Sequence, residues 1–266
     1  MSLMGHLRRG RMMAALGIDV AALSITYTGA HTDYGMVTMS DGARYRLLAF
    51  TSSGTLSIEQ PVNCEVCVVG GGANGAKAAG DRGGDGGAGA YLKNQSVSAY
   101  NGGPVVVGAR QGVSSIADVS VNAVSGQNGG TGGGGYDNGN GGTGDGLSKY
   151  PFGDATYTLW ASKPHCAGGG GGVARYKQGD RSYDYYTGGN GGTNGGNGNK
   201  STYGGSSGPT YSGTPGTGGT YGGGSGGASR RDGSNATYYG SAGGGSASAQ
   251  GSGYQGIVYM RIPVIQ

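Results

Sequence analysis

The sequence predicts a mainly β fold: a small, sandwich-like antiparallel framework into which glycine-rich loops are inserted. Three observations lead to this prediction. Short runs that alternate between apolar and polar residues fill the first part of the chain and return at residues 254–266. Between them the chain is dominated by glycine, with 67 glycines in 266 residues. The 19 tyrosines are unlike the composition of a disordered tail. We expect little or no α-helix beyond the N-terminus.

Residues 18–125 are predicted to form most of this framework, including a first glycine block. Asp41-Gly42 predicts a tight hairpin, because glycine readily adopts the positive φ angles that such a turn needs. Pro61 is expected to end a strand, since proline cannot donate a backbone hydrogen bond. The expected strands are 22–27, 34–39, 45–50, 55–58, 64–69, 97–100, 104–108, 114–116 and 119–123, with a closing strand in residues 254–266.

Residues 126–253 form the longest glycine-rich stretch, and a structureless loop of that length is improbable inside a compact domain. Glycine-rich chain can instead adopt an extended helix with three residues per turn and no internal hydrogen bonds. Several such polyglycine-II helices can pack side by side and bond to one another. We therefore predict packed polyglycine-II helices here, with disorder as the alternative.

Four stretches of the chain resemble the glycine-rich domain of bacteriophage tail-fibre and tail-tip proteins. They are YRLLAFTSSGTLSI (45–58), VCVVGGG (66–72), GGDGGAGA (83–90) and GYQGIVYMRI (253–262). The resemblance implies a β framework interrupted by glycine-rich loops, which in fibre-tip adhesins pack as polyglycine-II helices. It also implies binding to a bacterial surface receptor. No receptor-binding position is carried over, because those loops vary strongly within the family.

Residues 1–17 are rich in methionine and arginine, and are either a frayed terminus or a segment that docks on a larger assembly. As a docking segment they would use Arg8, Arg9 and Arg11 to contact other tail or virion proteins. The apolar run in 12–16 is too short for a secretory signal, so we expect assembly in the host cytoplasm and a place in the virion tail. The remaining chain is nearly neutral, which argues against nucleic-acid partners. No run is long enough for membrane insertion.

Two motifs in this sequence imitate chemical sites. Gly70-x-Gly72-x-x-Gly75 after an apolar strand matches the dinucleotide fingerprint, but glycines from Gly80 onward would end the required helix after one turn. Cys64 and Cys67 are three apart in a predicted strand, so their thiols should point to opposite faces. Only His165 and Cys166 could complete a metal site with these thiols, and they lie about a hundred residues away in the sequence. We predict no catalytic residues, no metal site and no cofactor.

Tyrosines within the glycine field are the candidate functional residues, because tyrosine with serine, glycine and asparagine is typical of binding loops. The alternative is that they only cover the packed glycine helices. Trp160 lies in an aromatic island that forms either a satellite cluster or an exposed tip. The candidate receptor-binding residues are Tyr183, Tyr185, Tyr186, Trp160, Tyr203, Tyr211, Tyr238 and Tyr239.

The leading functional hypothesis is a non-enzymatic phage tail-fibre or tail-tip adhesin whose partner is a bacterial surface receptor, either a glycan or an outer surface protein. A homotrimer is possible, as is a single copy at a fibre tip. The second hypothesis is a glycine-rich structural protein of a virion or of the extracellular space, without receptor binding. A third, a nucleotide-dependent enzyme, would require the Gly70–Gly75 motif to bind a cofactor.

Overall fold

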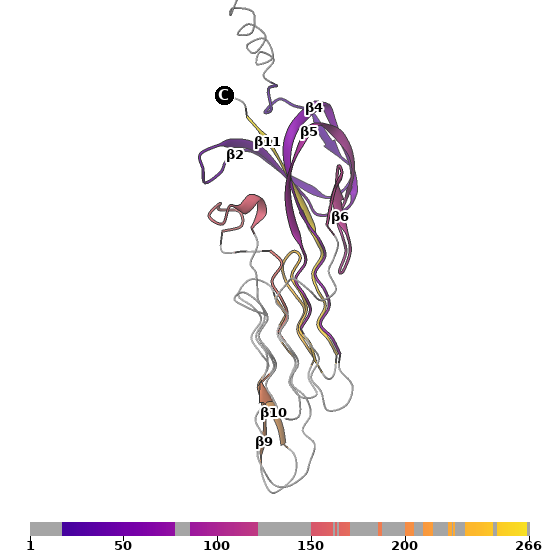
Figure 1. Ribbon diagram of the computed structural model, residues 1–266, viewed down its shortest axis with the longest axis vertical. Helices are drawn as coiled ribbons and strands as arrows, with labels where there is room; N and C mark the ends of the chain where they lie inside the picture. Colours follow the sequence, from indigo (N-terminus) through magenta and orange to yellow (C-terminus); the bar gives the residue numbers. More distant parts are fainter. Residues whose placement is uncertain are drawn as a thin grey trace, which may run out of the picture.

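The computed structural model describes residues 18–77, 86–121, 150–161, 163, 165–170, 186–187, 200–204, 210–214, 223–224, 226, 232–246 and 249–264. Figure 1 shows an elongated molecule with a β-sheet at one end and extended segments running side by side away from it. We call these two parts the sheet region and the glycine lattice. The mainly β prediction is confirmed.

The sheet region is an eight-stranded antiparallel sheet among the described residues, with β2-β3-β11-β4-β5-β6-β7 as its main order and β1 paired to β4. The closing strand β11 therefore lies between β3 and β4 and bonds to both. The strands are β1 (Ile25–Tyr27), β2 (His31–Thr38), β3 (Arg44–Phe50), β4 (Gly54–Val69), β5 (Leu92–Val106), β6 (Ser114–Ile116), β7 (Val119–Val121) and β11 (Ile257–Pro263).

The expected hairpin between β2 and β3 is present, and Gly42 has a φ of 83°. The expectation that Pro61 ends a strand is wrong, because β4 continues through it. The β4–β5 register shifts between Ser57 and Val62 and again before Cys64, so the ladder is already interrupted at the proline. A missing backbone N–H costs little at such an irregularity.

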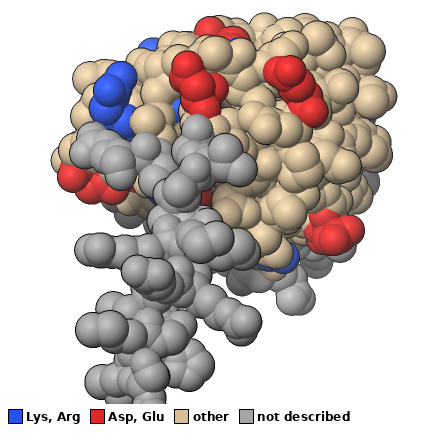
Figure 2. Space-filling model, turned by 90° about the horizontal axis from the view of Figure 1, so that it is seen from above, with Lys and Arg blue, Asp and Glu red and all other residues tan. Residues whose placement is uncertain are grey.

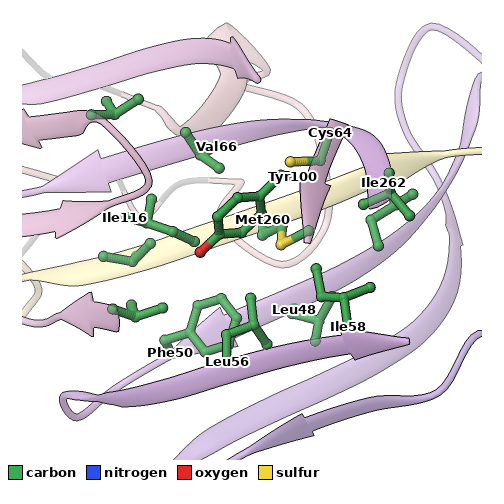
Figure 3. Packing of buried hydrophobic residues seen from close by; sticks show 14 of the residues in the cluster. Leu48, Phe50, Leu56, Ile58, Cys64, Val66, Tyr100, Ile116, Met260 and Ile262 are labelled. Carbon is green, nitrogen blue, oxygen red and sulfur yellow. The ribbon is translucent and has the colours of Figure 1, made fainter. Parts of the chain in front are cut away.

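The interruption lets the sheet curl over on itself and enclose one hydrophobic cluster, as the two layers of a sandwich would. In Figure 3, Leu48, Phe50, Leu56 and Ile58 lie on one side of this cluster and face Val66 and Ile116, with Met260 between them. Leu48, Phe50 and Val66 are fully buried. We call this the inner cluster.

The opposite face of the central strands carries a second cluster, which we call the outer cluster. Leu47, Cys67 and Tyr259 point to this side and are covered by residues 150–161, which include the short 3-10 helix η1 (Pro151–Gly153). Cys64 belongs to the inner cluster and Cys67 to the outer one, so the predicted divergence of the two thiols is confirmed. Burial raises the pKa of Cys64 to about 12.

Below the sheet, the glycine lattice is organised around the segment 240–246. In the described part of the chain it exchanges backbone hydrogen bonds with six segments, 73–76, 87–90, 167–170, 223–224, 232–236 and 251–254. Three of them accept N–H groups of the segment and three donate to its carbonyls, while the N–H of Gly240, at its start, donates to the Gln255 carbonyl at 2.9 Å. This is the arrangement of a hexagonally packed polyglycine-II helix, as the sequence predicted.

A period of three runs through these bonds. Ala242 and Gly245 donate to Ala167 and Gly170, at 2.8 and 2.9 Å, and these donors and acceptors are each three residues apart. Gly243 and Ser246 donate in the same way to residues 73 and 76, at 3.0 and 3.1 Å. A helix with three residues per turn presents each third N–H to the same neighbour, which explains the pattern.

The first glycine block, residues 70–90, was predicted to lie within the β framework. Its described residues belong instead to the same lattice as the later glycine segments. The bond from Gly243 to Ala73 and the bond from Gly87 to Gly243, at 2.8 Å, join the two directly. Residues 70–77 are not helical, so no helix that could face a pyrophosphate begins within the described part of the dinucleotide-like motif. Gly72 is instead in contact with a neighbouring backbone: a Cβ there would lie 1.9 Å from the Ser241 carbonyl oxygen.

Candidate functional site

A small antiparallel sheet at the far end of the lattice carries three of the candidate tyrosines. It consists of β8 (Tyr186–Thr187), β9 (Lys200–Gly204) and β10 (Thr210–Thr214), and we call it the distal sheet. Tyr203 and Tyr211 stand directly opposite one another in the β9–β10 register, and Tyr186 pairs with Ser201. Figure 1 places β9 and β10 at the end opposite the sheet region.

Trp160 is a buried residue of the outer cluster, so the satellite-cluster alternative describes it and the exposed-tip alternative does not. Its ring packs edge-on against Tyr157 and Tyr259, at centroid distances of 4.8 and 5.4 Å. Its indole N–H donates to the Asp154 carbonyl. With its polar atom bonded and its ring covered, Trp160 fastens residues 150–161 to the sheet.

Arg261 strengthens the same attachment from β11. Its guanidinium lies 4.3 Å from the centre of the Tyr45 ring and 4.4 Å from that of Phe152, so it is held between two aromatic faces. It also donates to Glu65 at 2.7 Å, across the β11–β4 pair. The arrangement joins the sheet to η1.

Tyr238 and Tyr239 are half-buried at the junction of the sheet and the lattice, where they surround His165. The His165 ring lies 5.0 Å from Tyr238 and 6.2 Å from Tyr239, and its Nε2 is 3.1 Å from the Tyr259 hydroxyl. Burial lowers the pKa of His165 to about 3 and raises that of Tyr238 to about 12. These tyrosines therefore serve in packing as well as offering part of their surface.

A surface pocket of about 370 Å³ lies beside this junction and was not foreseen from the sequence. Arg110, Asn235, Ser252, Tyr254 and Gln255 line it together with small residues, and we call it the junction pocket. Tyr254 is among the large side chains that remain exposed. No sequence motif predicts the pocket, because its residues come from the segments 109–110, 235–236 and 252–255, which are far apart in the sequence.

Tyr183 and Tyr185 fall outside the described residues, as do Arg8, Arg9 and Arg11.

Within the residues that are described, no group of three or more His, Cys, Asp or Glu side chains could hold a metal ion. The described helical structure includes no segment long and apolar enough to cross a membrane. Seen from the sheet end, acidic side chains stand apart from one another (Figure 2).

Comparisons of the chain with protein-family models, with curated proteins and with solved structures gave no match.

Proposed function

We propose that this protein is a receptor-binding adhesin of the phage tail-fibre or tail-tip type, which presents the distal sheet to a bacterial surface. One observation carries the proposal. The chain enters and leaves the described structure at the sheet region, whereas β9 and β10 lie at the opposite end of the lattice (Figure 1). A molecule built in this way can attach by one end and bind by the other.

The lattice suits the role of a stiff spacer between these two ends. Its segments are joined by backbone bonds of 2.7–3.2 Å, which do not depend on mobile side chains. Close contact between backbones leaves no space for rearrangement, since a Cβ at Gly243 would lie 2.1 Å from the Gly251 carbonyl oxygen. A rigid support lowers the entropic cost of ordering a binding surface.

Tyrosine is a suitable contact residue for such a tip. It offers a large flat ring and a hydroxyl with few rotatable bonds, so it binds glycans and proteins at a low entropic cost. Tyr203 and Tyr211 form a cross-strand pair of the distal sheet, and Tyr186, Tyr183 and Tyr185 lie on or next to β8 in the sequence. The receptor is a glycan or an outer surface protein.

Residues 1–17, with Arg8, Arg9 and Arg11, would then dock the protein on other tail proteins at the sheet end. The proposed location is the virion tail, after assembly in the host cytoplasm. The protein would act there without catalysis, as one copy or as a homotrimer. A structural protein without receptor binding remains the second candidate, because the same lattice would suit a building block that contacts only virion proteins.

Binding of the fluorescently labelled protein to a panel of bacterial strains tests the proposal. We expect binding to some strains only, and a loss of about tenfold or more on changing Tyr203→Ala together with Tyr211→Ala, as for aromatic hot-spot residues. Tyr34→Ala is the matched control, since Tyr34 is exposed on β2 at the sheet end. Equal binding to all strains, or an equal loss in the control, would contradict the proposal. Deletion of residues 1–17 should abolish particle incorporation and leave cell binding intact.

A further inference from the structure

We infer that the junction pocket is a second binding site, on the side of the molecule, for a sugar unit that carries a carboxylate. The pocket lies beside the sheet and not at the distal sheet, so the inference does not rest on the proposed function. Its volume of about 370 Å³ is at the small end of the range of about 300–1,000 Å³ found for ligand pockets.

The charge of the pocket comes from Arg110. Its Nη1 donates to the Ser252 hydroxyl at 2.9 Å, which fixes the direction of the guanidinium. Arg46 and Arg261 each have a carboxylate at 2.7 Å, whereas Arg110 has none among the described residues. None of the described residues that line the pocket is acidic. The free edge of the planar guanidinium is therefore suited to the two oxygens of a ligand carboxylate.

The remaining polar groups match the hydroxyls of a sugar, which both donate and accept. The Asn235 side-chain oxygen accepts from the Ser252 backbone N–H at 2.8 Å, which directs its NH₂ group away from that bond. The Gln255 NH₂ donates to the Thr51 carbonyl at 3.0 Å, so its oxygen remains as an acceptor. One amide thus offers donors and the other an acceptor, and both are held in place by protein bonds.

Tyr254 supplies a flat apolar surface for the sugar ring. It is 37% exposed, and its ring is in T-shaped contact with the Tyr239 ring at a centroid distance of 5.6 Å. Its backbone is fixed on both sides, since its N–H donates to Ser241 and its carbonyl accepts from Gly72, each at 2.8 Å. An exposed ring on a fixed backbone, next to a few directed polar groups, is the composition of a preformed ligand site.

Titration of the full chain with the methyl glycoside of glucuronic acid, followed by NMR, tests the inference. We expect saturable binding with a Kd on the order of 1 mM. Methyl glucoside, which lacks the carboxylate, should bind about tenfold more weakly, and so should acetate, which lacks the ring. Arg110→Gln should weaken glucuronide binding about tenfold, while Arg44→Gln should leave it unchanged. Arg44 is likewise exposed and begins β3, so the control removes the same charge elsewhere.

Three results would overturn the inference: no saturable binding of the glucuronide, acetate binding as tight as that of the glucuronide, or the same affinity in the Arg110→Gln and Arg44→Gln variants. Tyr254→Ala should also weaken binding, and an unchanged thermal unfolding midpoint would show that this variant is folded. All these measurements use the purified protein without cells. The pocket can therefore bind even if the distal sheet has no receptor, and Tyr203→Ala should not alter it.

Discussion

The sheet region and the glycine lattice are both densely packed, but they achieve it by opposite means. In the sheet region, side chains such as Phe50 and Val66 fill the interior and are fully buried. In the lattice the backbones themselves are in contact, so that a Cβ at Gly72 or Gly251 would lie 1.9 Å from a carbonyl oxygen. The sheet depends on which side chain is present, whereas the lattice depends on side chains being absent.

The two regions also differ in what opposes unfolding. Burial of apolar side chains stabilises the sheet, at about 25 cal/mol for each Å² removed from water. The lattice has few such side chains, and each of its hydrogen bonds contributes only about 1 kcal/mol net, against the large entropy that glycine loses on ordering. Its stability must therefore be shared over many neighbouring segments. If the segment 240–246 lost its structure, all six segments that bond to it should therefore be destabilised.

Gly243→Ala should give the largest effect and would separate the two regions most clearly. Gly243 lies at the centre of the lattice, and its new methyl group would meet the Gly251 carbonyl carbon at 2.3 Å. Because backbone is on the other side, the clash cannot be relieved by a rotamer change. We expect a loss of about 4 kcal/mol in the free energy of unfolding, measured with denaturant. Hydrogen exchange should rise throughout the lattice.

Gly35→Ala is the control for this change. Gly35 has a φ of 64°, but nothing lies within 4 Å of a Cβ there, so only backbone strain of about 1 kcal/mol is expected. Equal destabilisation by the two substitutions would show that the lattice tolerates a side chain, and the contrast between the regions would fail.

Leu48→Ala should give the next largest effect, through a cavity rather than a clash. Leu48 is fully buried in the inner cluster, facing residues of the opposite side of the curled sheet (Figure 3). We expect a loss of about 3 kcal/mol in the free energy of unfolding. Leu48→Met, which keeps the volume, should cost less than about 1.5 kcal/mol. A lattice glycine should show no such tolerance for a volume change.

Acid should weaken the boundary between the regions through His165. Its pKa is about 3 in the folded protein and 6.5 ordinarily, so below pH 6.5 the unfolded chain binds a proton that the folded chain does not. The free energy of unfolding should therefore fall by about 2–3 kcal/mol between pH 6.5 and 4.5. This window lies above the range in which Asp33 and Asp154, whose pKa values are lowered, are protonated.

His165→Phe should flatten this pH dependence while keeping an aromatic ring against Tyr238, Tyr239 and Tyr259. His31→Gln is the matched control, because His31 is exposed on β2. If the His31 variant flattened the profile and the His165 variant did not, the assignment of the acid sensitivity to the boundary would be wrong.

Much of the fold could be predicted from local sequence. The Asp41-Gly42 turn, the alternating strands and the glycine-rich composition that permits packed extended helices are each visible within a few residues. The continuation of β4 through Pro61 could not be predicted, because it depends on a register shift against β5. The joining of residues 70–76 to 240–246 also escaped prediction, since all glycine segments look alike in sequence.

The candidate sites were less accessible to sequence reasoning. The junction pocket combines Arg110 with Asn235 and Tyr254, and nothing in the sequence relates these distant residues. Trp160 shows the opposite difficulty: a lone tryptophan in a polar stretch suggested either a tip or a cluster, and the deciding contact, Tyr259, is about a hundred residues away. The tyrosines of the distal sheet remain predictions for receptor binding.

The position of β11 has a consequence for how the protein is made. β11 is the central partner of β3 and β4, yet it follows them by about two hundred residues, and the lattice centre 240–246 comes just before it. A growing chain on the ribosome therefore lacks the middle of both regions until these residues have emerged. Folding must be largely post-translational and slowed by long-range closure. A chain that stops before residue 240 would lack both centres, so incomplete products should expose apolar surface and aggregate.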